Sequence, residues 1–179
     1  VADAGPTPSR REQSKANNRQ AILQAARRVF AQLGYDNATA RDIIRGTDLA
    51  AGTFYNYFKS KEEVFEALAD DGARRFRPLL RAQRETATRF EDYLHGAVVG
   101  YFQFLVEENP AEGLPVAARG PHVRANTPEM IAVFEEVKSG VSDAIARGLA
   151  PPVDAEYLAC ACIGIAQEVG QALLAREPR

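Results

Sequence analysis

The spacing of apolar residues is the feature that most constrains how this chain can fold. Between residues 22 and 33 apolar side chains recur every three or four positions, and Gly34 then follows as a helix stop. The same spacing returns in residues 90–108, 127–147 and 154–176, and no stretch alternates apolar and polar residues as a half-buried strand would. The sequence therefore predicts an all-α fold. We expect no membrane span, which would need about 18 uncharged residues in a row.

Composition and breaks divide the chain into three parts. Residues 1–13 hold two prolines and few large apolar side chains, which predicts a disordered tail. Residues 14–60 are expected to form a three-helix domain, and residues 61–179 a larger helical domain whose first helix, 61–84, links the two. We expect Pro78 to bend or end that linking helix, because proline lacks the N–H that continues the hydrogen bonding.

Capping residues place the shorter helices. The first helix is expected at about 15–33, and Thr39, with Asp42 three residues on, forms a capping box for the second. The third helix is expected at about 50–57, and Ser60 opens a capping box for the long helix that follows. Prolines and glycines predict a loop over 110–126, with one short helix near 116–119.

Charge is divided unevenly along the chain. The net charge of −2 comes from 22 basic and 24 acidic residues. Residues 1–61 hold ten basic and five acidic residues, a net +5, and the remainder holds twelve and nineteen, a net −7. A basic head on an acidic body favours a polyanion partner at the head, most simply nucleic acid, although a split of this size can arise by chance. The arginines between 74 and 84 fit a solvated face, or bridges to DNA or to the acidic body.

Residues 50–61 carry the side chains expected of a DNA-reading helix in a helix-turn-helix module. Small residues at its start allow close approach to bases, hydroxyl and amide groups follow, lysines come next for phosphates, and Phe54 and Phe58 face the core. In order these residues are Ala51, Gly52, Thr53, Tyr55, Asn56, Tyr57, Lys59 and Lys61. Alternatively, the two tyrosine rings could pack against the protein with their hydroxyl groups in contact with water.

The strings Thr39-Ala40-Arg41-Asp42-Ile43 and Gly52-Thr53-Phe54-Tyr55-Asn56-Tyr57-Phe58-Lys59-Ser60-Lys61-Glu62 extend this pattern. Over about residues 15–70 the chain resembles the N-terminal DNA-binding domain of TetR-family transcriptional regulators. The resemblance implies a larger C-terminal domain for ligand binding and dimerisation, and repression that a small molecule relieves.

The resemblance also assigns roles by position. It implies base contacts for Ala51, Gly52, Tyr55 and Asn56, phosphate contacts for Thr53, Tyr57 and Lys61, and backbone contacts near Thr39, Ala40 and Arg41. The chain departs from the pattern at Asp48, where glycine is usual, and at Ala50, where the cap is usually Ser or Thr. Losing that cap costs about 1 kcal/mol and removes a hydroxyl that could touch phosphate.

Two sets of apolar residues in the body suggest two further sites. The last helix is apolar on more than one side, which favours a dimer interface over a monomer core helix. Its predicted interface residues are Leu158, Ala161, Cys162, Ile165, Ala166, Val169 and Leu173. Residues Tyr93, Leu94, Val98, Tyr101, Phe102, Met130 and Phe134 are expected to line a ligand cavity, although aromatic stripes more often form core.

Together these observations predict a bacterial, cytoplasmic DNA-binding regulator with no cofactor and no metal. The expected activity is repression by a homodimer on a palindromic DNA operator, released by a small apolar or amphipathic inducer. The alternative is a helix-turn-helix protein whose body is a protein-interaction platform without an inducer. An enzyme is not expected, because the chain has no zinc-protease motif, no glycine-rich phosphate loop and no nucleophile elbow. Cys160 and Cys162 lie on opposite sides of a helix, which favours packing over metal binding.

Overall fold

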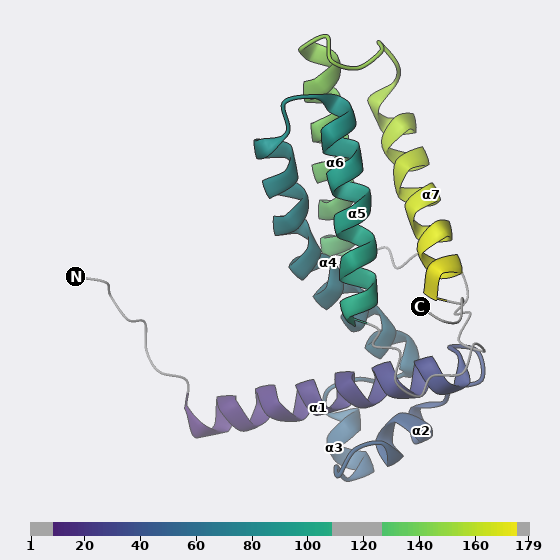
Figure 1. Cartoon of the computed structure of the whole chain (residues 1–179). Coiled ribbons are helices and arrows are strands. Elements are labelled where there is room, and N and C mark those ends of the chain that lie inside the picture. The colour runs from purple at the N-terminus through teal and green to yellow at the C-terminus, as the bar shows by residue number, and fades with distance from the viewer. Residues whose placement is uncertain (1–8, 109–126, 175–179) are drawn as a thin grey trace.

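The computed structural model describes residues 9–108 and 127–174, and within them every regular element is a helix. A small domain of α1–α3 lies across one end of an upright bundle of α4–α7 (Figure 1). The all-α prediction is confirmed. The short helix expected near 116–119 lies outside the described residues. The helices are α1 (Arg10–Leu33), α2 (Ala40–Arg45), α3 (Ala51–Tyr55), α4 (Lys61–Thr86), α5 (Phe90–Glu108), α6 (Pro128–Ala146) and α7 (Ala155–Leu174).

Helix α1 begins at Arg10, five residues before the position expected from apolar spacing. The Ser9 side chain accepts a hydrogen bond from the Glu12 amide, and the Glu12 carboxylate accepts one from the Ser9 amide at 2.7 Å. This capping box satisfies two amides that would otherwise lack partners. Residues 10–13 therefore belong to the helix and not to a tail.

The small domain is built around a tight apolar core. Phe54 and Ile43 have no exposed surface, and Phe58 is buried beside them, as the sequence indicated. The predicted capping box of α2 is confirmed, with Thr39 and Asp42 each accepting from the other's amide. Helix α3 begins at Ala51, and its N-cap residue, Ala50, makes no side-chain hydrogen bond. It is held instead by Phe54, whose ring packs against Phe58.

Helix α4 continues through Pro78, so the expectation that the helix could end there is wrong. A proline inside a helix costs about 3 kcal/mol through a lost hydrogen bond and a clash. Phe76 and Leu80 lie on either side of it and are both buried in the core of the bundle. Packing on both sides of the proline outweighs the local cost.

The bundle closes as a ring in which α4 packs on α5 and α6, and α7 packs on the same two helices. Ion pairs reinforce the contact between α4 and α6. Arg81 and Arg84 both bind Glu136, which is 9% exposed, and two further arginines of α4 bind Glu129. The arginines of α4 thus bridge to the acidic body and do not form a free basic face.

Candidate nucleic-acid interface and ligand pocket

The predicted base-facing residues lie together on the outer surface of α3. Ala51, Gly52, Tyr55 and Asn56 are exposed, whereas Phe54 between them is fully buried. Tyr55 is 55% exposed, and its ring stands edge-on to Phe54 at 5.3 Å. Figure 1 shows α2 and α3 at the end of the molecule away from the bundle. The geometry therefore presents a rigid helix face with hydroxyl and amide groups pointing outward.

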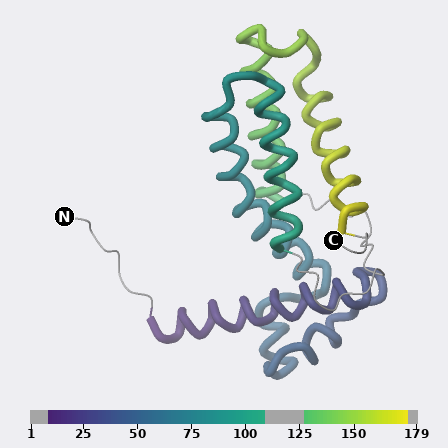
Figure 2. The backbone as a smooth tube through the Cα atoms, in the orientation of Figure 1, coloured from purple at the N-terminus to yellow at the C-terminus, as the bar shows by residue number. Residues whose placement is uncertain are grey.

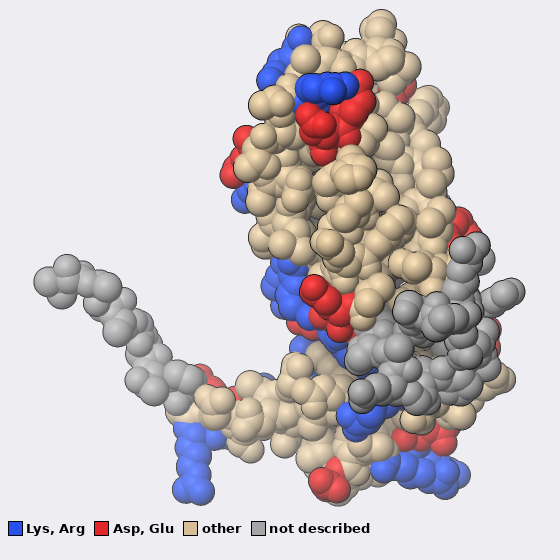
Figure 3. All heavy atoms as spheres, in the orientation of Figure 1, with Lys and Arg blue, Asp and Glu red and all other residues tan. Residues whose placement is uncertain are grey.

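The predicted phosphate-facing residues surround this face. Thr39 and Arg41 lie at the start of α2 and are exposed, with Ala40 half-buried between them. Thr53 and Tyr57 are half-buried on α3 and just after it, and Lys59 is exposed. The space-filling view shows basic side chains at this end of the molecule (Figure 3). The exposed Arg41 and Lys59 place positive charge beside this polar helix face, which suits a polyanion.

Lys61 has a different environment from the other ten predicted DNA contacts. Its Nζ donates to the carbonyls of Tyr35, Asp36 and Ala38 at 2.8, 3.3 and 2.9 Å, and lies 4.6 Å from the centre of the Tyr35 ring. An ammonium has three donors, and here all three are used. A phosphate contact would have to replace one of these bonds. Sequence reasoning missed this arrangement because its partners are main-chain groups 23–26 residues earlier.

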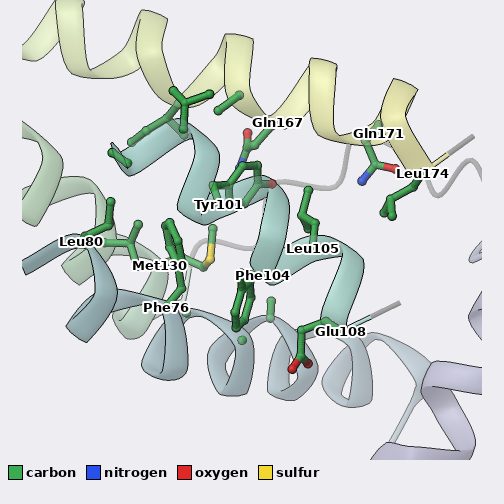
Figure 4. A pocket seen from close by; sticks show the side chains of 18 of the residues that line it. Phe76, Leu80, Tyr101, Phe104, Leu105, Glu108, Met130, Gln167, Gln171 and Leu174 are labelled. Carbon is green, nitrogen blue, oxygen red and sulfur yellow. The ribbon is translucent and has the colours of Figure 1, made fainter. Parts of the chain in front are cut away.

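A cavity of about 500 Å³ runs through the bundle and reaches α1 (Figure 4). Five of the predicted ligand residues line it: Tyr93, Leu94, Val98, Tyr101 and Met130. Two do not line it. Phe102 follows Tyr101 and therefore points about 100° away around the helix, and Phe134 packs beside the bundle core.

Helices α4 and α7 supply cavity residues that the sequence analysis did not single out. Phe76 and Leu80 of α4, with Gln167 and Gln171 of α7, face the space between the helices (Figure 4). Charged residues are spread through the α4 sequence and hide its apolar side. The cavity wall is therefore mostly apolar, with amides toward one end.

An ion-pair network lies along the part of the cavity wall nearest the small domain. Arg27 of α1 binds Asp71 at 2.9 Å and also binds Glu108, and Arg75 binds the same two carboxylates. Burial tends to raise the pKa of Glu108, but hydrogen bonds from Arg75 and Arg27 outweigh it and hold that pKa below its ordinary value. Arg27 and Glu108 also line the cavity, so the network joins α1, α4, α5 and the cavity wall.

Two glycines make room for aromatic rings of the cavity wall. A Cβ on Gly140 of α6 would lie 2.6 Å from the Tyr93 hydroxyl, and one on Gly170 of α7 would lie 2.5 Å from Leu105 and 3.2 Å from Tyr101. Tyr93 is 5% exposed, and its burial raises the pKa of its hydroxyl to about 12. These rings therefore pack closely against the two glycines, and the Tyr93 hydroxyl stays neutral at ordinary pH.

The outer side of α7 is apolar and exposed. Ile165 is 65% exposed and Val169 46%, and Ala161 is exposed beside them, whereas Cys162 and Ala166 turn inward and line the cavity. In the described part of the chain α7 alone is long and apolar enough to cross a membrane, judged by length and a mean hydropathy of 1.3, with 11% of that stretch buried. An apolar face this open needs a covering surface.

Comparison with known proteins agrees with this geometry. Residues 22–68 match the family described as bacterial regulatory proteins, tetR family. The transcriptional repressor AcnR of Corynebacterium efficiens is 44% identical over 59 residues, which cover 33% of this chain and 31% of that repressor. The match thus spans about a third of that relative's length.

Two solved structures share the fold over most of the chain. The fatty acid degradation regulator FadR from Bacillus halodurans has a TM-score of 0.69 and 22% identity, over 88% of this chain and 84% of its own. The regulator FadR from Bacillus subtilis, solved in complex with stearoyl-CoA, has a TM-score of 0.68 and 17% identity, over 87% of this chain and 86% of its own. These relatives are named as regulators or repressors and not as enzymes. Residues 22–68 thus match the tetR family of bacterial regulatory proteins in sequence, and the chain shares the fold of these two regulators over most of its length.

Proposed function

We propose that this chain is a transcriptional repressor of the bacterial cytoplasm that binds a palindromic operator as a homodimer and releases it when a small apolar or amphipathic ligand binds. The observation that carries the proposal is the cavity, because it is walled both by the bundle and by Arg27, Phe30 and Ala31 of α1. A ligand inside it would touch the domain that carries the DNA-facing helix. The match of that domain to known regulators supports the DNA-binding half of the proposal.

The second copy is expected to cover the outer face of α7. Two recognition helices must stand about 34–36 Å apart to read successive half-sites, which requires two copies in fixed positions. The exposed Ile165 and Val169 offer the apolar surface for that contact. Lipid is the poorer occupant, because α7 packs along α5 and α6 and carries Glu156 paired with Lys138 at 3.0 Å.

The cavity favours an elongated ligand with one polar end. Its wall follows α5 from Leu94 to Glu108, about 21 Å at 1.5 Å per residue. Apolar residues line most of that length, whereas Gln171, Glu108 and Arg27 lie toward the small domain. Because a structural neighbour was solved with stearoyl-CoA, a long-chain acyl thioester is the first compound to test.

Release would follow from the ion-pair network at that end. Arg27 is held by Asp71 of α4 and Glu108 of α5, so the position of α1 depends on both helices. A ligand that parts these helices pulls on Arg27 and changes the spacing of the two recognition helices. Such a ligand binds the DNA-incompetent arrangement more tightly and so shifts the population away from the operator.

The test begins with selection of bound sequences from genomic DNA, followed by fluorescence anisotropy on the selected duplex. We expect a palindromic site, binding that weakens steeply with salt, and release by stearoyl-CoA. Asn56→Ala should lose discrimination between the selected and a scrambled duplex. Equal binding of both duplexes by the wild-type protein would refute a sequence-specific regulator.

The protein-interaction alternative makes a different prediction. In that case the wild-type protein would bind its operator, but stearoyl-CoA and shorter acyl thioesters would leave both the affinity and the thermal stability unchanged. The open cavity of about 500 Å³ favours the ligand-responsive version.

A further inference from the structure

The first turns of α1 project beyond the core of the small domain (Figure 2). Every residue from 9 to 17 is exposed, and Ile22 is the first fully buried side chain. The projecting segment has no apolar stripe, so it offers no apolar surface on which another protein could pack. A helix that is polar on all sides is stabilised by charge contacts or by a polar partner.

The charges on this segment form a stripe. Arg11, Lys15 and Arg19 are spaced by four residues, and each such step turns only about 40° around the helix. None of the three has an acidic partner within residues 9–108 and 127–174. The arginines of α4 offer a contrast, because those between residues 74 and 84 are all bound to carboxylates of the body.

The stripe begins beside the candidate DNA interface. The Arg19 guanidinium lies 5.5 Å from the centre of the Phe58 ring, just after α3. Basic side chains gather beneath the N-terminal end of α1, on the side where α2 and α3 lie (Figure 3). The projecting end of α1 and helix α7 lie on opposite sides of the molecule (Figure 1). In a dimer formed through α7, the two stripes therefore point away from the two-fold axis.

We propose that Arg11, Lys15 and Arg19 bind the phosphate backbone of the DNA that flanks each half-site on its outer side. The inference rests on the proposed function and adds a contact outside the recognition helix. Arg11 lies about 12 Å beyond Arg19 along α1, enough to reach three or four base-pair steps of 3.4 Å. The contact reads no sequence. It lengthens the footprint and strengthens the dependence of binding on salt.

The experiment compares two operator duplexes, one ending at the outer edges of the half-sites and one extended by six base pairs on each side. The variant is R11Q/K15Q, because glutamine matches both residues in helix propensity. The control R89Q/R147Q removes the same charge from two exposed positions on the body. Affinity is measured against salt for each protein on each duplex, with hydroxyl-radical footprinting on the long one.

Wild-type protein and the control should bind the long duplex more tightly and protect its flanks. In R11Q/K15Q the advantage of the long duplex and the flank protection should disappear, with binding to the short duplex unchanged. Four lost contacts per dimer lower the salt slope on the long duplex by about 3.6, a difference of about a hundred-fold between 50 and 200 mM salt. R11K/K15R should restore the wild-type pattern.

Two failures remain distinct. If wild-type protein does not separate the operator from a scrambled duplex, the proposed function itself is refuted. If wild-type protein does separate the two duplexes, and R11Q/K15Q keeps the flank protection and the salt slope, the stripe does not bind DNA. The proposed regulatory function is then unaffected.

Discussion

Lys61 offers a sharp test of the structure, because its ammonium group is already bound by three carbonyls of the segment that joins α1 to α2. Lys61→Met keeps the length of the side chain and removes all three donors. Hydrogen bonds to a charged group contribute about 1.5–3 kcal/mol, and the nearby Tyr35 ring adds about 0.5 kcal/mol. Since one half-exposed ammonium serves all three carbonyls, we expect a loss of about 2–3 kcal/mol. This corresponds to a fall in Tm of about 4–12 °C for a chain of this size.

Lys59→Met is the matched control. Lys59 lies two residues away, carries the same charge and is exposed. Its loss should change Tm by less than about 2 °C, but lower the salt slope of operator binding by about 1.8 per dimer. Lys61→Met should leave that slope unchanged. Differential scanning calorimetry and anisotropy titrations measure the two quantities. If K61M keeps the wild-type Tm and loses salt slope as K59M does, the reasoning fails and Lys61 binds phosphate.

Three further predictions concern the body. Because the pKa of Glu108 is lowered in the folded chain, its ion pairs stabilise the protein above about pH 4.5 and are lost as the pH falls through the lowered value. Glu108→Gln should therefore weaken the fall in the free energy of unfolding at acid pH, as measured by urea titrations. An unchanged fall in the variant would contradict the network. Burial raises the pKa of Cys162, which lines the cavity, whereas Cys160 is exposed. Stearoyl-CoA should therefore slow maleimide labelling of Cys162 in C160S and leave Cys160 in C162S unaffected, and equal rates would argue against the pocket. Ile165→Glu should reduce the mass measured by light scattering to that of one chain, 19.6 kDa. The control Val106→Glu, at an exposed position on α5, should remain a dimer. A dimeric I165E protein would place the interface elsewhere.

The small domain could be predicted closely because its signals are local. The box at Thr39 and Asp42 and the burial of Phe54 and Phe58 follow from neighbours within a few residues, and the structure confirms them. The start of α1 was misplaced because the prolines before Ser9 hid the cap formed by Ser9 and Glu12.

The body was harder to predict because its determinants are distant in sequence. Pro78 does not break α4, since buried Phe76 and Leu80 on either side depend on contacts with other helices. The network around Glu108 joins residues up to 81 positions apart, which no local pattern shows. Helical spacing alone could not decide which aromatic residues line the cavity, because neighbours such as Tyr101 and Phe102 are both large and aromatic and face different directions.

The glycines opposite Tyr93 and Tyr101 bear on how the selectivity of the cavity for a ligand could change. Gly140 does not line the cavity, yet any side chain there would force the Tyr93 ring to move, and Gly170 constrains Tyr101 and Leu105 in the same way. One added methyl group at either position would reshape the cavity without replacing any residue that lines it. For the ligand proposed above, selectivity for chain length could thus change through substitution of these two buried glycines, while every side chain that lines the cavity keeps its chemistry.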